Sequence, residues 1–217
     1  DPHTLDAVVL SHAHIDHSGA LPILVRQGYR GPIYATHATR DLCAVMLADA
    51  ANIQESDARY VNKVIDRDRV DMEHVEPLYR EPDVAPVLAQ MVASSYHRRF
   101  QIAPGIHALF LDAGHVLGSA ITVIDAEEDG RVRRLVFTGD LGRRSMPILR
   151  DPEIAHGAHV LLSESTYGDR LHPPMTEMDT ALAAVVDRGA RRCGTIVIPS
   201  FALERAQEIV YALKRLD

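Results

Sequence analysis

The chain contains 217 residues, of which 47% are hydrophobic and 24% charged, and its formal net charge is −7. These values are typical of an ordinary soluble globular protein with one substantial core, or one domain plus part of another. They argue against a surface coated in positive potential, and neither a membrane-length apolar run nor a signal-peptide pattern occurs. Cys43 and Cys193 are far apart in sequence, which argues against a disulfide framework and favours a reducing cytoplasm.

Hydrophobic spacing and turn residues divide the chain into strands and helices. In chain order, the first half is expected to contain a buried strand at 6–10, a helix at 20–27, a strand at 32–35, a helix at 38–58, an irregular charged stretch to about residue 82 and a helix at 84–92. The second half is expected to contain strands at 100–102, 106–111, 120–124 and 135–137, a buried strand at 159–162, a helix at 181–187, a strand at 195–198 and a helix at 203–216. Thr36 is placed to cap the long helix, and Asp129-Gly130 marks a turn. This mixture predicts an α/β layered domain whose reactive residues gather on loops at strand ends.

The densest chemical signal is the run Ser11-His12-Ala13-His14-Ile15-Asp16-His17, directly after the first strand. His12 and His14 are two residues apart, so in extended chain they point the same way and can hold one metal ion. Asp16 and His17 lie past the bend and are free to face a second ion. A lone histidine is usually a surface residue, but four ligand-type residues so close together favour a site for zinc or a similar divalent ion.

Two later strand ends supply further candidate ligands. His115 lies in a loop between Gly114 and Gly118, where glycine lets the backbone approach a site closely, and Asp140 follows the strand at 135–137. Taken alone, His115 would be an ordinary packed or solvated histidine and Asp140 a turn-forming aspartate. With the first cluster present, we predict one site of His12, His14 and His115, a second site of Asp16 and His17, and Asp140 shared between them. The second site, so composed, is one protein ligand short.

The positive charge is almost entirely arginine and is gathered in short runs, namely Arg98-Arg99, Arg131 to Arg134, Arg143-Arg144 and Arg191-Arg192. Guanidinium groups suit phosphate. Solvated hairpin ends and helix termini explain such runs equally well. Charge alone therefore leaves the substrate open.

Three motifs carry a resemblance to a known family. The run from His12 to His17 resembles the signature of the metallo-β-lactamase superfamily. The runs Ser163-Glu164-Ser165-Thr166-Tyr167-Gly168-Asp169-Arg170 and Ile198-Pro199-Ser200-Phe201-Ala202-Leu203-Glu204-Arg205-Ala206-Gln207-Glu208 are similar to the β-CASP branch, which includes ribonuclease J and the endonuclease that cleaves pre-mRNA before polyadenylation. The likeness covers nearly the whole chain in one consistent order, with one departure at Glu204, where the branch often has glycine.

The resemblance implies an α/β fold of the four-layer αβ/βα sandwich type, with the metals at one rim of two facing sheets. It divides the chain into residues 1–170, a metallo-β-lactamase domain that lacks its first strands, and residues 171–217, the incomplete beginning of a β-CASP cap domain. The chain is thus expected to be a fragment. The family's opening strands would precede Asp1, and two further histidines, one a metal ligand and one a general acid, would follow Asp217.

By the same resemblance, the chain carries most of the metal site of a zinc-dependent ribonuclease, which cleaves RNA phosphodiester bonds with a water activated by two Zn²⁺ ions, Mn²⁺ being an alternative. Asp16 would ligate metal and orient that water, and Glu164 would hydrogen-bond a catalytic histidine supplied from downstream. From the residues alone, Glu164 is equally a helix N-terminal carboxylate or a salt-bridge partner. Single-stranded RNA is the expected partner, a homo-oligomer is compatible, and no membrane partner is expected.

Other functions remain open at this point. A small-molecule thioester or lactam hydrolase would use the same metal loop, but the motifs at 163–170 and 201–208 speak against it. A non-catalytic subunit of an RNA-processing complex would typically have eroded ligands, whereas all six expected ligands are present here. A DNA repair nuclease is a weaker alternative, because the motifs look closer to RNA processing.

Overall fold

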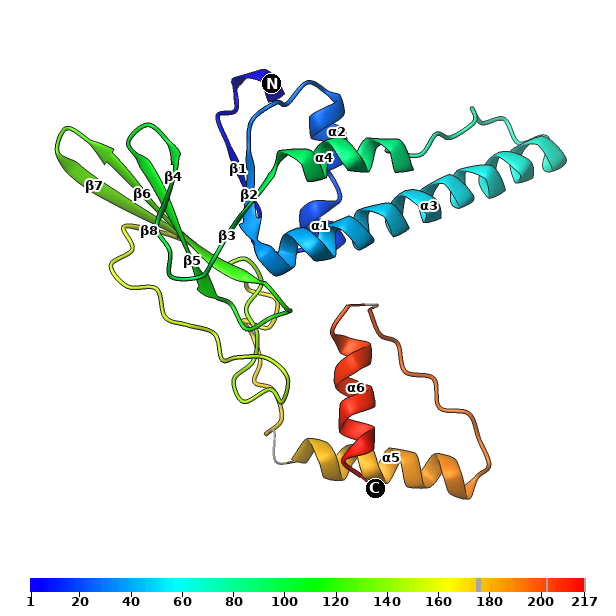
Figure 1. Cartoon of the computed structure of the whole chain (residues 1–217). Helices are drawn as coiled ribbons and strands as arrows, with labels where there is room; N and C mark the ends of the chain where they lie inside the picture. The colour runs from blue at the N-terminus through cyan, green and yellow to red at the C-terminus, as the bar shows by residue number, and fades with distance from the viewer. Residues whose placement is uncertain (175–176, 202, 217) are drawn as a thin grey trace.

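A computed structural model gives the chain as an α/β fold (Figure 1). The structure describes residues 1–174, 177–201 and 203–216. In these ranges the strands are β1 (Val8–Val9), β2 (Ile33–Thr36), β3 (Met91–Ser94), β4 (Phe100–Ala103), β5 (Ile106–Asp112), β6 (Ala120–Glu128), β7 (Arg131–Phe137) and β8 (Val160–Leu162). The helices are α1 (Ile15–Ser18), α2 (Leu21–Arg26), α3 (His37–Asp68), α4 (Val84–Gln90), α5 (Met178–Arg191) and α6 (Arg205–Lys214), with short 3-10 helices at Pro2–Thr4 and Glu81–Asp83.

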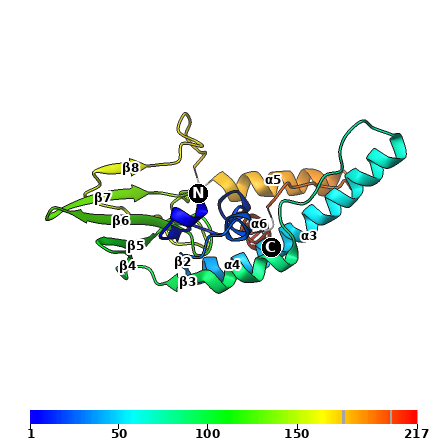
Figure 2. The same ribbon diagram turned by 90° about the horizontal axis from the view of Figure 1, so that it is seen from above.

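Within the described residues the strands form two sheets. The first is parallel, in the order β1-β2-β3, and the second has the order β4-β5-β6-β7-β8, antiparallel except for the parallel pair β7 and β8. In Figures 1 and 2, α2, α3 and α4 lie on one side of the first sheet and the second sheet lies on the other. The predicted α/β class is therefore confirmed.

The main core lies between the first sheet and its helices. Its largest fully buried side chains include Tyr29, Ile33, Leu47, Tyr79 and Val87. Burying an aliphatic side chain of this size stabilises a fold by about 1.5–3 kcal/mol. This core holds β1 and β2 in place, and so fixes where the histidine run begins.

Helix α3 is longer than the sequence suggested. The helix was expected at 38–58, with an irregular charged stretch after it, but it continues to Asp68. Thr36 caps its first turn, since its side chain accepts a hydrogen bond from the backbone of Thr39 at 3.2 Å. The buried face is formed largely by small residues and differs from the apolar stripe that contains Val45 and Ile53, which are 68% and 52% exposed. Ile65 continues the buried face about two turns past residue 58, within a stretch rich in charged residues.

The second sheet contains a two-residue hairpin where the sequence predicted a turn. Asp129 and Gly130 both have positive φ, 51° and 70°, which is the conformation that joins twisted antiparallel strands with a tight turn. Beneath it, the guanidinium of Arg134 donates two hydrogen bonds to the carboxylate of Asp125, at 2.7 and 2.9 Å. Val123 and Val136 face a smaller apolar cluster on the same sheet.

Three expectations need correction. The helix predicted at 84–92 ends at Gln90, and the chain continues as strand β3, which pairs with β2. Residues 159–162 do contain strand β8, but it is not buried, since Val160, Leu161 and Leu162 are 51%, 60% and 52% exposed. Residues 195–198 form no strand, because an extended segment becomes a strand only beside a hydrogen-bonding neighbour, and no described residue pairs with this segment in a sheet.

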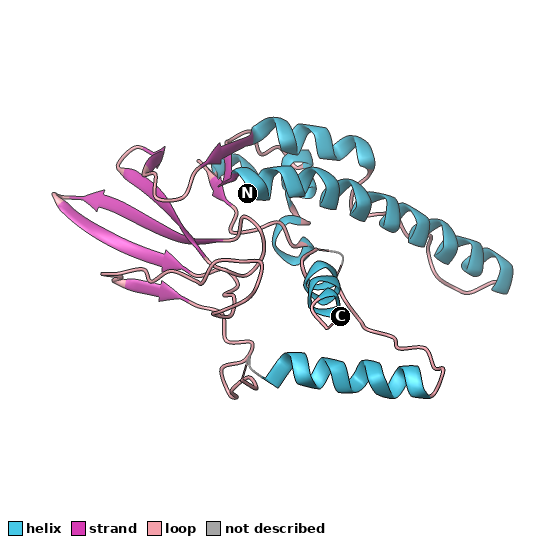
Figure 3. Cartoon of the chain, turned by 60° about the horizontal axis from the view of Figure 1, so that its bottom comes forward, coloured by secondary structure: helices cyan, strands magenta, loops and turns pink. Residues whose placement is uncertain are grey.

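Helices α5 and α6 contact each other at the C-terminal end of the chain, and none of their residues is buried. Figure 3 shows α5 well apart from α3. None of the helices in the described ranges is both long and apolar enough to cross a membrane.

Candidate metal centre

The histidine run lies where the two sheets meet. After β1, residues 10–14 have no regular secondary structure, and α1 begins at Ile15. The hydroxyl of Ser18 donates to the carbonyls of Ala13 and His14, at 2.9 and 3.0 Å, which closes the turn. A backbone bond from Ala120 to Ser11, at 2.9 Å, ties the start of β6 to this segment. The loop that carries the histidines is thus fixed to both sheets.

The loop that carries His115 is held by hydroxyl groups. Ser119 accepts hydrogen bonds from the backbone of His115 at 3.1 Å and of Val116 at 3.2 Å. Thr36 and Thr39, at the start of α3, both donate to the carbonyl of Gly118, at 2.7 and 2.9 Å. Gly118 has φ of 85°, and a side chain there would collide with α3. The helix that caps itself with Thr36 therefore also fixes the position of His115.

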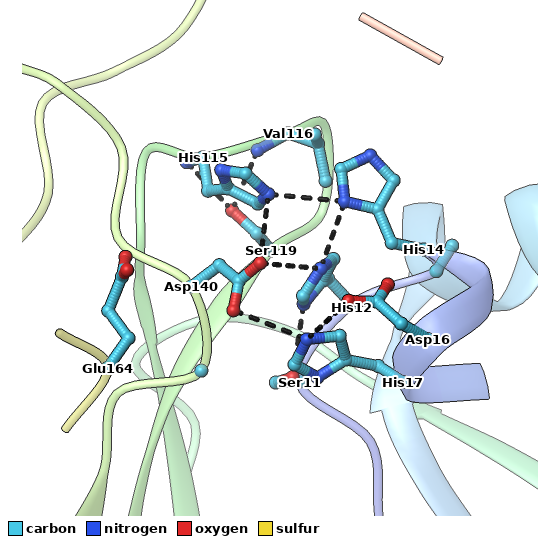
Figure 4. Close-up of polar contacts among 12 residues, drawn as sticks. Ser11, His12, His14, Asp16, His17, His115, Val116, Ser119, Asp140 and Glu164 are labelled. Atoms are coloured by element: carbon cyan, nitrogen blue, oxygen red, sulfur yellow. Dashed lines mark hydrogen bonds and ion pairs between the residues drawn. The ribbon is translucent and has the colours of Figure 1, made fainter. Parts of the chain in front are cut away.

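The first predicted site forms a compact group. His12, His14, His115 and Asp140 each offer one ligand atom, and all these atoms lie within 4.8 Å of one another (Figure 4). Nδ1 of His14 lies 3.1 Å from Nε2 of His12 and 3.2 Å from Nε2 of His115. The sequence placed these residues as many as 128 positions apart, and the fold brings them together.

The second predicted site forms a smaller group that shares a residue with the first. Asp16, His17 and Asp140 offer ligand atoms within 4.8 Å of one another. One carboxylate oxygen of Asp140 lies 3.2 Å from Nε2 of His17, and the other lies 3.7 Å from His12 and 3.5 Å from His115. Asp140 therefore faces both groups, as a bridging carboxylate must. Asp16 is the most open member, with its side chain 73% exposed.

The chemistry of this donor set fits divalent metal ions. Burial, helped by the neighbouring imidazoles, lowers the pKa of His12 to about 3, and burial is also the main cause that lowers the pKa of His14 and His115. These imidazoles are therefore neutral near pH 7, which is the form that binds metal. Nδ1 of His12 lies 3.1 Å from the hydroxyl of Ser11, a contact that leaves Nε2 free when Nδ1 carries the proton. His14 faces the other imidazoles with Nδ1, whereas its Nε2 is buried with no hydrogen-bond partner among the described residues.

Glu164 lies beside this cluster and outside both ligand groups (Figure 4). Its carboxylate accepts hydrogen bonds from the backbone of Leu141 at 2.6 Å and of Thr166 at 3.4 Å. Burial alone would raise the pKa of Glu164, but these hydrogen bonds outweigh it and lower the pKa. Glu164 thus braces the residue that follows Asp140. Its expected bond to a downstream histidine stays a prediction.

Sequence reasoning missed the residues that support the ligands. Ser11, Ser119 and Thr39 position His12, the His115 loop and Gly118 through hydroxyl groups. Serine and threonine are too common for their positions to stand out. Their positions in the sequence are the one available signal: Ser11 precedes the ligand His12, and Ser119 follows Gly118 of the His115 loop.

The comparisons with known proteins agree with this geometry. A model of the beta-lactamase superfamily domain matches residues 1–196. The chain belongs to the metallo-β-lactamase superfamily. This metallo-β-lactamase chain is 39% identical over 213 residues to Ribonuclease TTHA0252 of Thermus thermophilus, covering 98% of the chain and 44% of that relative. It is 33% identical over 214 residues to Transcription termination factor FttA of Methanosarcina mazei, covering 97% of the chain and 31% of that relative.

FttA of Thermococcus kodakarensis is 34% identical over 220 residues, covering 99% of the chain and 31% of that relative. The similarity to these relatives extends over nearly the whole chain, and the assignment to the β-CASP branch stays a prediction. The metallo-β-lactamase chain spans less than half the length of the curated relatives it matches. A solved protein of unknown function from Enterococcus faecalis V583 matches 62% of the chain and 24% of its own length, at 19% identity and a TM-score of 0.32, which is too low to bear on the fold.

Proposed function

We propose that this chain forms most of the active site of a metal-dependent hydrolase that cleaves phosphodiester bonds in RNA. The observation that carries the proposal is the shared carboxylate of Asp140, which faces three imidazoles on one side and His17 with Asp16 on the other. A related protein bears the name Ribonuclease TTHA0252, which favours RNA over a small-molecule substrate.

The position of each residue indicates which metal ion it would bind. His12, His14 and His115 would hold one ion, Asp16 and His17 would hold the second, and Asp140 would touch both. A pair of divalent ions, zinc or alternatively manganese, supplies Lewis acidity at the phosphate and lowers the pKa of a bound water. The side chain of Asp16 is 73% exposed, so its carboxylate is available to orient that water. Glu164 keeps the Asp140 loop in place through Leu141 and stays ionised, because its hydrogen bonds lower its pKa.

The wider organisation follows from the same family. We propose that residues 1–170 belong to the metallo-β-lactamase domain, a four-layer sandwich in the complete protein, and that residues 171–217 begin the β-CASP cap. Of that second range, residues 175, 176, 202 and 217 lie outside the described residues. Single-stranded RNA is the proposed substrate, and a reducing cytoplasm remains the expected location.

The test is His14→Ala in the full-length protein, with His107→Ala as a matched control, since His107 lies on β5 outside the metal groups. We expect His14→Ala to lose bound zinc and RNA cleavage together, at least 100-fold for cleavage, while RNA binding stays within about threefold. Unchanged cleavage by His14→Ala would refute the assigned role of the site.

The same protein distinguishes the other candidate functions. Faster hydrolysis of thioesters or lactams than of RNA would favour a small-molecule hydrolase. Absence of tightly bound metal from the purified protein, determined by elemental analysis, would favour a non-catalytic subunit of an RNA-processing complex.

A further inference from the structure

An exposed aromatic ring stands beside the metal cluster. The side chain of Phe201 is 79% exposed, yet its ring centroid lies 6.3 Å from that of His14, with the ring planes tilted by 47°. This separation falls within the range over which aromatic rings contact one another.

Glu204, three residues after Phe201, contacts the His115 loop. Glu204 accepts a hydrogen bond from the backbone of Leu117 at 3.4 Å. The backbone of Glu204 has φ of 71° and ψ of −57°, and Arg205 donates to the carbonyl of Leu203 at 3.0 Å. This is a γ-turn with positive φ, a rare and strained conformation for a residue other than glycine. This strained turn lies directly before α6, three residues after Phe201.

We propose that Phe201 is a stacking platform for a nucleobase of single-stranded RNA, the base of a nucleotide adjacent to the phosphate bound at the metal cluster. The proposal rests on the proposed function and adds a substrate-binding residue to it. An aromatic face binds any base, and the bases of a single strand are free to leave their neighbours and stack on it, whereas duplex bases are not. Leu117, which is 56% exposed and linked to Glu204, adds apolar surface beside the same loop.

A nucleobase fits this position better than a protein side chain does. The ring lies one aromatic contact away from a predicted metal ligand, so whatever covers Phe201 must lie next to the reacting phosphate. In a phosphodiester substrate the group next to the phosphate is a nucleoside.

The experiment uses the full-length protein loaded with zinc and compares Phe201→Leu with Phe201→Tyr. Leucine keeps apolar bulk and loses the aromatic face, whereas tyrosine keeps the face. Tyr60→Leu is the matched control, because Tyr60 is a 69% exposed aromatic residue on α3 and outside the metal groups. Binding is measured by fluorescence anisotropy with two probes of equal length, an oligouridylate and the same backbone without bases. Zinc content is measured in every variant.

We expect Phe201→Leu to weaken oligouridylate binding by about 5- to 150-fold, the range for one base stacked on an aromatic residue. Its affinity for the abasic strand and its zinc content should match those of the wild type, and Phe201→Tyr and Tyr60→Leu should bind both probes normally. Equal affinity of Phe201→Leu and wild type for oligouridylate would overturn the stacking role alone. An equal loss for both probes would also overturn it, since Phe201 would then serve to pack the protein. If the wild type binds neither probe, the proposed function itself fails.

Discussion

Gly142 is the point at which the loops of Asp140 and His115 touch, and Gly142→Ala should separate them. The backbone of Gly142 donates a hydrogen bond to the carbonyl of Ala113 at 2.8 Å. A β-carbon at position 142 would overlap the carbonyl group of Gly114 and lie 2.7 Å from the backbone nitrogen of His115. The atoms in the way are all backbone, so no side chain can move aside to make room. The two loops must part instead.

The size of the effect follows from these contacts. The β-carbon would lie 1.6 Å from the carbonyl oxygen of Gly114, so restoring an ordinary van der Waals distance requires the loops to separate by about 2 Å. Metal–ligand distances tolerate deviations of only about 0.2 Å. Either His115 or Asp140 then moves out of bonding reach of a shared ion, which should weaken zinc affinity by at least about 10- to 100-fold, the range for changes that disturb the support of a ligand. Overpacking of this kind should also lower the free energy of unfolding by about 1–3 kcal/mol.

Calorimetric titration of the metal-free chain with Zn²⁺ measures the affinity, and urea unfolding of the same samples measures stability. Gly194→Ala is the control, because a β-carbon there would lie 3.8 Å from the carbonyl oxygen of Gly189, an ordinary contact. It should leave zinc affinity unchanged. If Gly142→Ala also binds zinc like the wild type, the contact between the two loops does not set the geometry of the site, and the reasoning fails.

Three other changes test separate parts of the structure. Thr36→Val removes the hydroxyl that caps α3 and donates to Gly118, and should lower the free energy of unfolding by about 1–2 kcal/mol in urea, with Thr36→Ser restoring most of it. Asp125→Asn removes the carboxylate charge and one of the two oxygens that accept from Arg134, and should cost about 1 kcal/mol, a loss that shrinks in high salt; a salt-independent loss would contradict an ionic origin. In the metal-free chain, the folded-state pKa of His12 is about 3, so the unfolded state takes up the proton first. The contribution of neutral His12 to the free energy of unfolding is therefore complete above about pH 6.5 and is lost as pH falls toward 3. Urea unfolding should detect a decrease in the free energy of unfolding of about 1 kcal/mol between pH 7.5 and 5.5. A free energy of unfolding that does not change over this range would contradict the prediction.

The sequence by itself determined the ligand types and much of the secondary structure. A dense run such as His12 to His17 is visible without any structure, because its chemistry depends on residue identity and local spacing. The same holds for the Asp129-Gly130 turn, where local backbone preference decides the conformation.

Only the tertiary structure decided which residues meet. That Asp140 faces both groups, and that Ser11 and Ser119 hold the ligands, depends on two sheets coming together at Ala120 and Ser11. The apolar run at 195–198 looked like a strand, but strand formation requires a neighbour, which no local pattern reports. Local spacing determines which ligands and turns a segment can form, whereas long-range packing determines which other segments lie beside it.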